Sequence, residues 1–199
     1  HKVTGALSCP LINALLTQTK LPLGQIANHA GLANPRALNR ETQRLFNATA
    51  ANLRAKHADA NELAKDSLLG EAITVELPVQ GPYDLGWVFD YLAARALEGI
   101  ETVKDHHYQR RVSPAGASPV YVHVYAQKRA LHTRLPLSCG SAQSWLARVV
   151  RLFDLGVDSR VIDRALKKAP VLGASVAAAP GLRVPGAWDG FESAVRAVL

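Results

Sequence analysis

One stretch of the sequence, residues 81–103, limits the possible folds most strongly. Pro82 interrupts any strand that precedes it, and Asp84 can cap the first free N–H groups of a helix. Apolar residues then recur at helical spacing, and they are Leu85, Val88, Phe89, Leu92 and Ala96. Gly99 supplies the left-handed residue that commonly ends a helix. The stretch predicts a helix closed by Gly99, whose apolar face needs a sheet to lie on.

The flanking sequence supplies that sheet. Apolar and polar residues alternate with a period of two in the segments 73–77, 100–112, 120–125 and 131–137. This alternation predicts antiparallel strands with one buried face. Ser141 then opens a second helix, in which Trp145, Val149, Leu152 and Phe153 share a face. The order β-α-β-β-β-α predicts a two-layer α+β domain over residues 72–157, with its helices on one side of the sheet.

The last part of the chain, residues 158–199, is expected to be the start of an incomplete helical domain. Asp158 is the predicted cap of a helix whose inward residues are Val161, Ile162, Ala165 and Leu166. A loop of Ala, Pro and Gly residues follows. A final helix after Pro185 and Gly186 carries the apolar residues Trp188, Phe191, Ala194, Val195 and Val198.

The first part of the chain, residues 1–57, predicts a helical module. A short helix over 10–20 has Leu11, Ala14, Leu15 and Leu16 on its inner side. A second helix begins at Pro22, a tight turn follows at Gly31, and Asn34 can cap a third helix with Pro35 at its first position. Helix, glycine turn and helix together are typical of a helix-turn-helix unit. Residues 58–71, rich in Ala, Lys, Asp and Glu, are expected to be a linker.

The outward side of that third helix favours contact with double-stranded DNA. The candidate DNA-binding residues are Asn34, Arg36, Asn39, Arg40, Gln43 and Arg44. Arginine binds guanine edges and phosphates, and asparagine and glutamine pair with adenine in the major groove. A net charge of +7 also favours an anionic partner. An ordinary solvated helix face is the alternative interpretation.

Composition excludes several classes of protein. Cys9 and Cys139 are far apart and form no CxxC pair, so the sequence predicts two buried free thiols and neither a zinc finger nor a disulfide scaffold. No apolar run is long enough to span a membrane and no charged-then-apolar leader is present, so we expect a cytoplasmic protein without a membrane partner. The sequence contains no methionine and begins with His1, from which we expect a fragment or the remnant of a longer gene.

Two polar clusters on the predicted strands allow weaker hypotheses. His106 or His107 could gather with His123 and His132 on the sheet and bind a metal ion. Adjacent residues of a strand point to opposite faces, so at most one of the first two can join such a cluster, and surface histidines are favoured. Tyr121 and Tyr125 could stack on bases, although sheets often carry tyrosine without a ligand. The prediction is therefore no metal and no small-molecule cofactor.

Residues 21–54 resemble the second helix-turn-helix of the AraC family. The resemblance lies in Ile26–Ala27, Gly31, Phe46 and Leu53–Arg54. The sequence departs from the family pattern at Leu38, Thr42, Asn47 and Ala50. Thr42 places a hydroxyl where the family has a large ring, a costly change if the position is buried.

Residues 82–199 are similar to the front part of the AlkA family of 3-methyladenine DNA glycosylases. The resemblance is carried by Pro82–Asp84, Leu92–Ala96, Glu101–Val103, Tyr108, Arg151–Leu155, Pro180–Gly186, Phe191–Glu192 and Val195–Ala197. A helix-turn-helix ahead of such a domain resembles the bifunctional Ada–AlkA group of DNA-repair proteins. The resemblance implies a sheet domain like that of TATA-binding protein. The implied activity is excision of alkylated bases: a base is flipped from the duplex and a carboxylate stabilises the positively charged sugar.

No catalytic residue can be assigned in this sequence. The candidate acids are Asp84, Asp90, Glu98, Asp154, Asp158, Asp163, Asp189 and Glu192, and they fall at caps, on polar faces or at positions that are non-catalytic in the family. The resemblance implies that the catalytic aspartate and the helix-hairpin-helix lie beyond Leu199, so we expect no glycosylase activity from this chain. The alternatives are a non-enzymatic AraC-type transcription regulator and an inactive gene remnant. The sequence does not indicate an oligomeric state.

Overall fold

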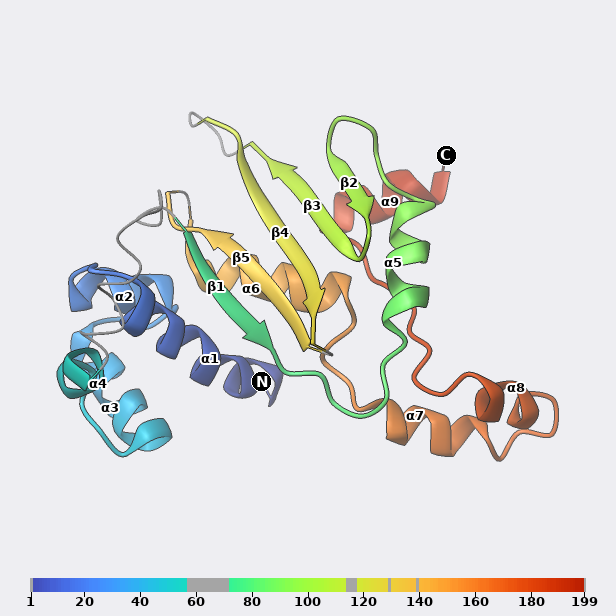
Figure 1. Ribbon diagram of the computed structural model, residues 1–199, viewed down its shortest axis with the longest axis horizontal. Helices are drawn as coiled ribbons and strands as arrows, with labels where there is room; N and C mark the ends of the chain where they lie inside the picture. The colour runs from blue at the N-terminus through green and yellow to red at the C-terminus, as the bar shows by residue number, and fades with distance from the viewer. Residues whose placement is uncertain (1, 57–71, 114–117, 129, 139, 199) are drawn as a thin grey trace.

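The computed structural model describes residues 2–56, 72–113, 118–128, 130–138 and 140–198, and the expected linker 58–71 lies outside these ranges (Figure 1). Four helices come first: α1 (Lys2–Gln18), α2 (Leu23–His29), α3 (Pro35–Phe46) and α4 (Ala50–Lys56). The next elements are β1 (Ala72–Leu77), α5 (Leu85–Ala93), β2 (Glu101–Lys104), β3 (His107–Val112), β4 (Val120–Gln127) and β5 (Ala130–Pro136). The chain continues with α6 (Ala142–Leu152), α7 (Ser159–Leu166), α8 (Gly173–Ala178) and α9 (Gly190–Val198).

The strands form one antiparallel sheet in the order β1-β5-β4-β3-β2. Its register places Val75 opposite Thr133, and Thr133 opposite Val124, so the buried residues of neighbouring strands share one face. That face buries Ile73, Val75, Leu77, Tyr108, Val122, Val124, Leu131 and Leu135. Helix α6 packs against β5 and helix α5 against β2 and β3 (Figure 1). The predicted α+β class and the single buried face are confirmed.

The segment 100–112 is two strands, so the prediction of one strand there is wrong. Strands β2 and β3 pair as a hairpin, with Lys104 opposite His107. The two residues between them, Asp105 and His106, have φ values of 51° and 59°. Two consecutive left-handed residues match the twist of antiparallel strands, and Asp and His tolerate this conformation better than most residues. The element order is therefore β-α-β-β-β-β-α.

Helix α5 begins as predicted and ends earlier than predicted. Asp84 caps it, because its Oδ1 accepts a hydrogen bond from the Trp87 N–H at 2.9 Å. The prediction that the helix runs to Gly99 is wrong: the Leu97 N–H donates to Oε2 of Glu101 at 3.1 Å rather than continuing the helical ladder. Gly99 is left-handed, with φ 75°, within the turn that leads to β2.

Helix α1 starts at Lys2, well before the predicted 10–20, and runs beside the outer edge of β1 (Figure 1). The side-chain amide of Gln18 donates to the Thr74 carbonyl at 2.8 Å and accepts from the Thr74 N–H at 2.8 Å. The backbone of an edge strand is thereby satisfied by a helix side chain. Cys9 on this helix is half-buried, contrary to the prediction of a buried thiol, and Cys139 lies outside the described residues.

Helix α7 does not bury the side chains that its periodicity predicts to be inward. Asp158 caps it as expected, with Oδ1 accepting from the Arg160 N–H at 2.9 Å. Val161 is 62% exposed, however, and Ala165, Ile162 and Leu166 are exposed too. Within the described residues nothing covers this side of α7. An amphipathic pattern predicts an apolar face, but it does not show whether another element packs against that face. The predicted loop after α7 contains the short helix α8.

Helix α9 follows Trp188, which is buried, but its own Phe191 is 81% exposed. No helix among the described residues is long and apolar enough to cross a membrane.

Candidate nucleic-acid interface

Helices α2 and α3 are joined by a turn whose geometry follows from three residues. Gly31 adopts φ +69°, a conformation that other residues rarely take. Asn34 Oδ1 accepts a hydrogen bond from the Ala37 N–H at 2.9 Å, and Pro35 stands at the first helical position, as predicted. The helix ends at Asn47, in the left-handed conformation with φ 53°. The sequence therefore defines both ends of α3.

Thr42 is fully buried in α3, the situation in which its hydroxyl would be costly. The hydroxyl donates to the Asn39 carbonyl at 3.0 Å, so the polar group is satisfied within the helix. Leu38 is fully buried on the same side of the helix. Both side chains are therefore buried, and the Thr42 hydroxyl keeps a hydrogen-bond partner.

All six predicted DNA-binding residues are exposed, but four of them already have partners in the chain. Asn34 caps the helix, Asn39 Oδ1 accepts from the Ala50 N–H at 3.1 Å, and Gln43 donates to Asn47 Oδ1 at 3.0 Å. Arg44 Nε donates to Glu41 at 3.0 Å, and this hydrogen bond holds the pKa of the Glu41 carboxyl below its ordinary value. Arg36 and Arg40 have no polar partner within the described ranges. These two free guanidinium groups, one helical turn apart, make the strongest candidates for phosphate contact.

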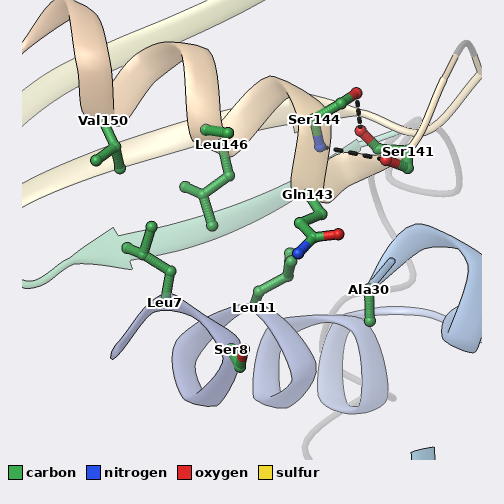
Figure 2. A pocket seen from close by; sticks show the side chains of 10 residues that line it. Leu7, Ser8, Leu11, Ala30, Ser141, Gln143, Ser144, Leu146 and Val150 are labelled. Atoms are coloured by element: carbon green, nitrogen blue, oxygen red, sulfur yellow. Dashed lines mark hydrogen bonds between the residues drawn. The ribbon is translucent and has the colours of Figure 1, made fainter. Parts of the chain in front are cut away.

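The turn between α2 and α3 rests on the α+β layer. Figure 2 shows Gln143 of α6 reaching toward α1, beside an apolar cavity of about 430 Å³ lined by Leu7, Leu11, Leu146 and Val150 among others. The Gln143 Oε1 atom lies 1.4 Å from the position that a Cβ would take at Gly31. None of the residues that line this cavity is charged. The cavity therefore suits a junction between helices and not a nucleic-acid site.

A second candidate surface lies between α5 and α9, and it was not predicted from the sequence. Trp87, Tyr91 and Arg95 follow one another at every fourth residue along α5 and the turn after it. The Trp87 and Tyr91 ring centroids are 6.3 Å apart, and the Arg95 guanidinium carbon lies 3.9 Å from the Tyr91 centroid. This row borders a groove of about 470 Å³, whose other lining residues are Leu97, Pro185, Gly186, Ala187, Ser193, Arg196 and Ala197. The groove thus combines an aromatic ring, a planar cation and apolar walls.

A buried network of charged side chains holds α9 against the sheet next to this groove. Arg110 Nη1 donates to Glu101 at 2.8 Å, and Arg110 also pairs with Glu192. Arg196 completes the ring, with 2.7 Å to Glu101 and 2.9 Å to Glu192. Burial alone raises the pKa of Glu101, but hydrogen bonds from Tyr108, the Leu97 N–H and Arg196, with the charge of Arg110, outweigh it and lower that pKa. Glu101, Arg110 and Arg196 are therefore charged at neutral pH.

Five of the candidate acids make structural contacts. Asp84 and Asp158 are helix caps, Asp189 accepts from the Glu192 N–H at 2.9 Å, and Asp163 accepts from the Gly181 N–H at 3.1 Å. Asp154 ends α6 with φ 48° and lies 3.6 Å from Arg183. Burial raises the pKa of Asp154, although the charge of Arg183 opposes the shift. Glu101 and Glu192 line a small cavity with Tyr91, and both are paired with Arg110 and Arg196.

The histidines of the sheet do gather on its uncovered face. His107 Nδ1 lies 3.0 Å from His123 Nε2, and Tyr125 stacks between His107 and His132 with centroid distances of 5.7 and 5.4 Å. His106 instead stacks on Phe89, so only one of the adjacent pair joins the cluster, as predicted. In the part of the chain that the structure describes, no three His, Cys, Asp or Glu side chains are arranged to hold a metal ion.

Comparison with known proteins places this architecture. The family model described as the AlkA N-terminal domain matches residues 74–189. The chain is 35% identical over 188 residues to a Mycobacterium tuberculosis protein described as a probable bifunctional transcriptional activator/DNA repair enzyme AlkA, covering 93% of this chain and 37% of the relative. It is 40% identical over 124 residues to the Escherichia coli DNA-3-methyladenine glycosylase 2, covering 60% of this chain and 41% of the relative. The chain thus spans about two fifths of the length of these relatives. Since the family model matches more than half of the sequence, the chain belongs to the AlkA N-terminal domain family.

Proposed function

We propose that this chain binds duplex DNA and forms a non-hydrolytic part of an alkylation-repair protein of the Ada–AlkA group. The activity of such a protein is excision of alkylated bases, such as 3-methyladenine, by hydrolysis of the N-glycosidic bond. The observation that carries the proposal is the similarity to the bifunctional mycobacterial relative, which extends over 93% of the chain and so includes both the first helices and the sheet.

In this proposal α2, the turn and α3 act as a partial helix-turn-helix of the AraC kind within residues 1–57. Arg36 and Arg40 neutralise phosphates, while Asn39, Gln43 and Arg44 stand where they can approach base edges after exchanging their internal partners. Residues 72–157 form the sheet domain, which we infer to be like that of TATA-binding protein. Residues 158–199 begin the next, helical part.

The groove between α5 and α9 is proposed to receive a nucleotide that has been extruded from the duplex. An extruded base needs a flat partner and a donor for its phosphate. The planar Arg95 guanidinium can stack on a base, and its N–H groups can bind a phosphate. Its central carbon lies 3.9 Å from the centroid of the Tyr91 ring, on which the guanidinium stacks. The buried ring of Arg110, Glu101, Arg196 and Glu192 keeps the α9 wall of the groove fixed.

Binding by α3 is tested with a fluorescently labelled duplex and anisotropy measured over a range of salt concentrations. The variant Arg36→Ala/Arg40→Ala should weaken binding and reduce the slope of log affinity against log salt by about 1.8, since each phosphate contact contributes about 0.9. Arg160→Ala/Arg164→Ala removes the same charge from exposed positions of α7 and is the matched control. Equal effects of the two variants would show that α3 is not the contact.

The groove is tested with a duplex that carries 2-aminopurine at a mismatch, because the fluorescence of this base rises when it leaves the stack. Addition of the chain should raise the fluorescence, and Tyr91→Ala should abolish the rise while Arg36→Ala/Arg40→Ala lowers only the affinity. An unchanged signal with Tyr91→Ala would eliminate the groove as the acceptor.

Glu101 and Glu192 line a small cavity beside Tyr91, but both carboxylates are paired with Arg110 and Arg196. We therefore propose that the purified 199-residue chain releases no 3-methyladenine from methylated duplex. Measurable turnover in that assay would contradict this part of the proposal. The chain would then need a catalytic acid that the geometry above does not identify.

A second candidate function is a non-enzymatic transcription regulator, favoured by the capped α3 and by the words "transcriptional activator" in the name of the mycobacterial relative. A regulator would prefer one sequence over others by a factor of about 10³ or more and would ignore base damage. An inactive remnant, the remaining alternative, would lack a cooperative thermal transition by circular dichroism. Two experiments therefore distinguish the repair protein, the regulator and the inactive remnant. One is a binding competition between duplexes of different sequence, and the other is a thermal melting curve.

A further inference from the structure

The face of the sheet opposite α5 and α6 is turned toward the viewer in Figure 1. Helix α1 borders this face along β1, where Thr74, Glu76 and His132 line a cavity together with residues of α1. Outward positions alternate with the buried ones along each strand. On β3, β4 and β5 these positions hold His107, Gln109, Arg111, Tyr121, His123, Tyr125, His132 and Arg134. We call this set the open face. Aromatic and cationic side chains are therefore concentrated on this solvent-facing surface, although the stability of the sheet does not require them there.

Tyr121 is the free aromatic side chain of the open face. It is 53% exposed, and its ring has no aromatic partner within the described residues. Beside it on the same strand, His123 and Tyr125 are fixed in the stacked row with His107 and His132. The rings of that row already stack on one another, whereas the Tyr121 ring is exposed and available for stacking.

Positive charge surrounds this ring. Arg111 is the cross-strand partner of Tyr121, and Arg134 is the partner of His123, two residues further along β4. Both arginines are exposed and lie within cross-strand or diagonal reach of Tyr121. Lys104 extends the charge onto β2, opposite His107. On the described outward strand positions the carboxylate is Glu76, at the far edge on β1, so the centre of the open face has a net positive charge.

We propose that the open face binds single-stranded DNA, with Tyr121 stacking on a base and Arg111, Arg134 and Lys104 binding the backbone phosphates. An exposed ring among cations is the arrangement that holds single strands without sequence preference. A single strand fits better than a duplex, because the bases of a duplex are already stacked and cannot present a face to Tyr121. The surface is separate from α3 and from the groove of α5 and α9, so the inference does not rest on the function proposed above.

The test uses the full chain and a 5′-labelled oligothymidylate of 20 nucleotides, which has no structure of its own. Tyr121→Ala should weaken binding about 5- to 150-fold, the range measured for loss of one base–aromatic stack. Tyr121→Phe keeps the ring and should bind as the unchanged chain does. Arg111→Ala and Arg134→Ala should each reduce the salt slope by about 0.7, the value for one phosphate contact on a single strand.

The control is Arg36→Ala/Arg40→Ala, which should weaken duplex binding and leave oligothymidylate binding unchanged. Because Tyr121 is exposed, its variants should keep the melting temperature, and a thermal scan checks this. The inference is overturned if Tyr121→Ala binds oligothymidylate within twofold of the unchanged chain. It is overturned equally if the α3 variant abolishes binding of the single strand, or if the labelled strand is bound only at α7 and lost with Arg160→Ala/Arg164→Ala.

Discussion

Replacement of Arg110 by methionine should destabilise the protein more than any surface charge change. The Arg110 side chain is 8% exposed and contacts two carboxylates, Glu101 at 3% and Glu192 at 11% exposure. Its guanidinium carbon also lies 4.7 Å from the Trp188 ring centroid. Methionine fills much of the volume and removes the charge, so the two carboxylates would share Arg196 alone.

The magnitude follows from removing one of the two cations that pair with the buried carboxylates. Removal of one member of a buried ion pair costs about 3–5 kcal/mol, because the desolvation penalty of the remaining charge is no longer offset. A protein of this size has about 5–15 kcal/mol of total stability, so Arg110→Met should remove a third or more of it. The loss should shrink as the pH falls, because Glu101 without the positive charge of Arg110 takes up a proton more easily and the buried negative charge disappears.

Urea unfolding followed by circular dichroism at pH 7 measures this loss. Arg160→Ala is the matched control, because Arg160 is paired with Asp158 at an exposed site, where solvent screens the attraction between the two charges. Glu192→Gln, which keeps the shape of the network, should cost about 1.5–3 kcal/mol and serves if Arg110→Met does not fold. A loss of less than about 1 kcal/mol for Arg110→Met, equal to the control, would refute the reasoning.

Three further predictions concern local geometry and pH. Gly31→Ala should destabilise by about 1–3 kcal/mol in urea unfolding, because of its left-handed backbone and its contact with Gln143, whereas Gly24→Ala, in an open helical position, should stabilise by about 0.5–1 kcal/mol. Asn34→Ala should cost about 1 kcal/mol through loss of the cap, and Asn34→Ser should recover most of it. Burial and neighbouring positive charge lower the pKa of His123 in the folded state, so the unfolded chain takes up the proton first and stability should fall as pH drops below about 6.5. His123→Gln should flatten that part of the pH profile, and an unchanged slope would contradict this assignment.

Local signals in the sequence predicted the sheet and the helix starts well. Period-two alternation located the buried residues of β1, β4 and β5, and the caps at Asp84, Ser141 and Asp158 were placed correctly. These features depend on residues within a few positions of one another, which is why the sequence alone can reveal them.

The errors came from contacts between residues that are distant along the chain, or from backbone conformation. The end of α5 depends on a hydrogen bond to the Glu101 side chain, and the β2–β3 hairpin depends on two left-handed residues without glycine. The exposure of the α7 stripe depends on what packs against it, which periodicity does not report. A helical or alternating pattern defines a face, and its partner must be known separately.

The candidate sites also differ in whether their residues are close together or far apart in the sequence. The α3 face could be predicted because its residues lie on one helix, although their contact with DNA stays a prediction. The groove could not, because it unites Tyr91 and Arg95 with Ser193 and Arg196, about a hundred positions later in the chain. The free state of Arg36 and Arg40 also required the structure, since the sequence treats all six polar residues of α3 alike.

The hydrogen bonds between the Gln18 amide and the edge strand β1 affect how truncated forms of this protein should behave. A truncated version that starts at residue 72 would keep every strand but lose the side chain that occupies Thr74, and the bare peptide groups would be open to the strand of another molecule. Such a piece should self-associate and precipitate in spite of an intact sheet. The first helix therefore helps to keep the sheet domain soluble, although the sequence predicted it to be part of the helical module over residues 1–57.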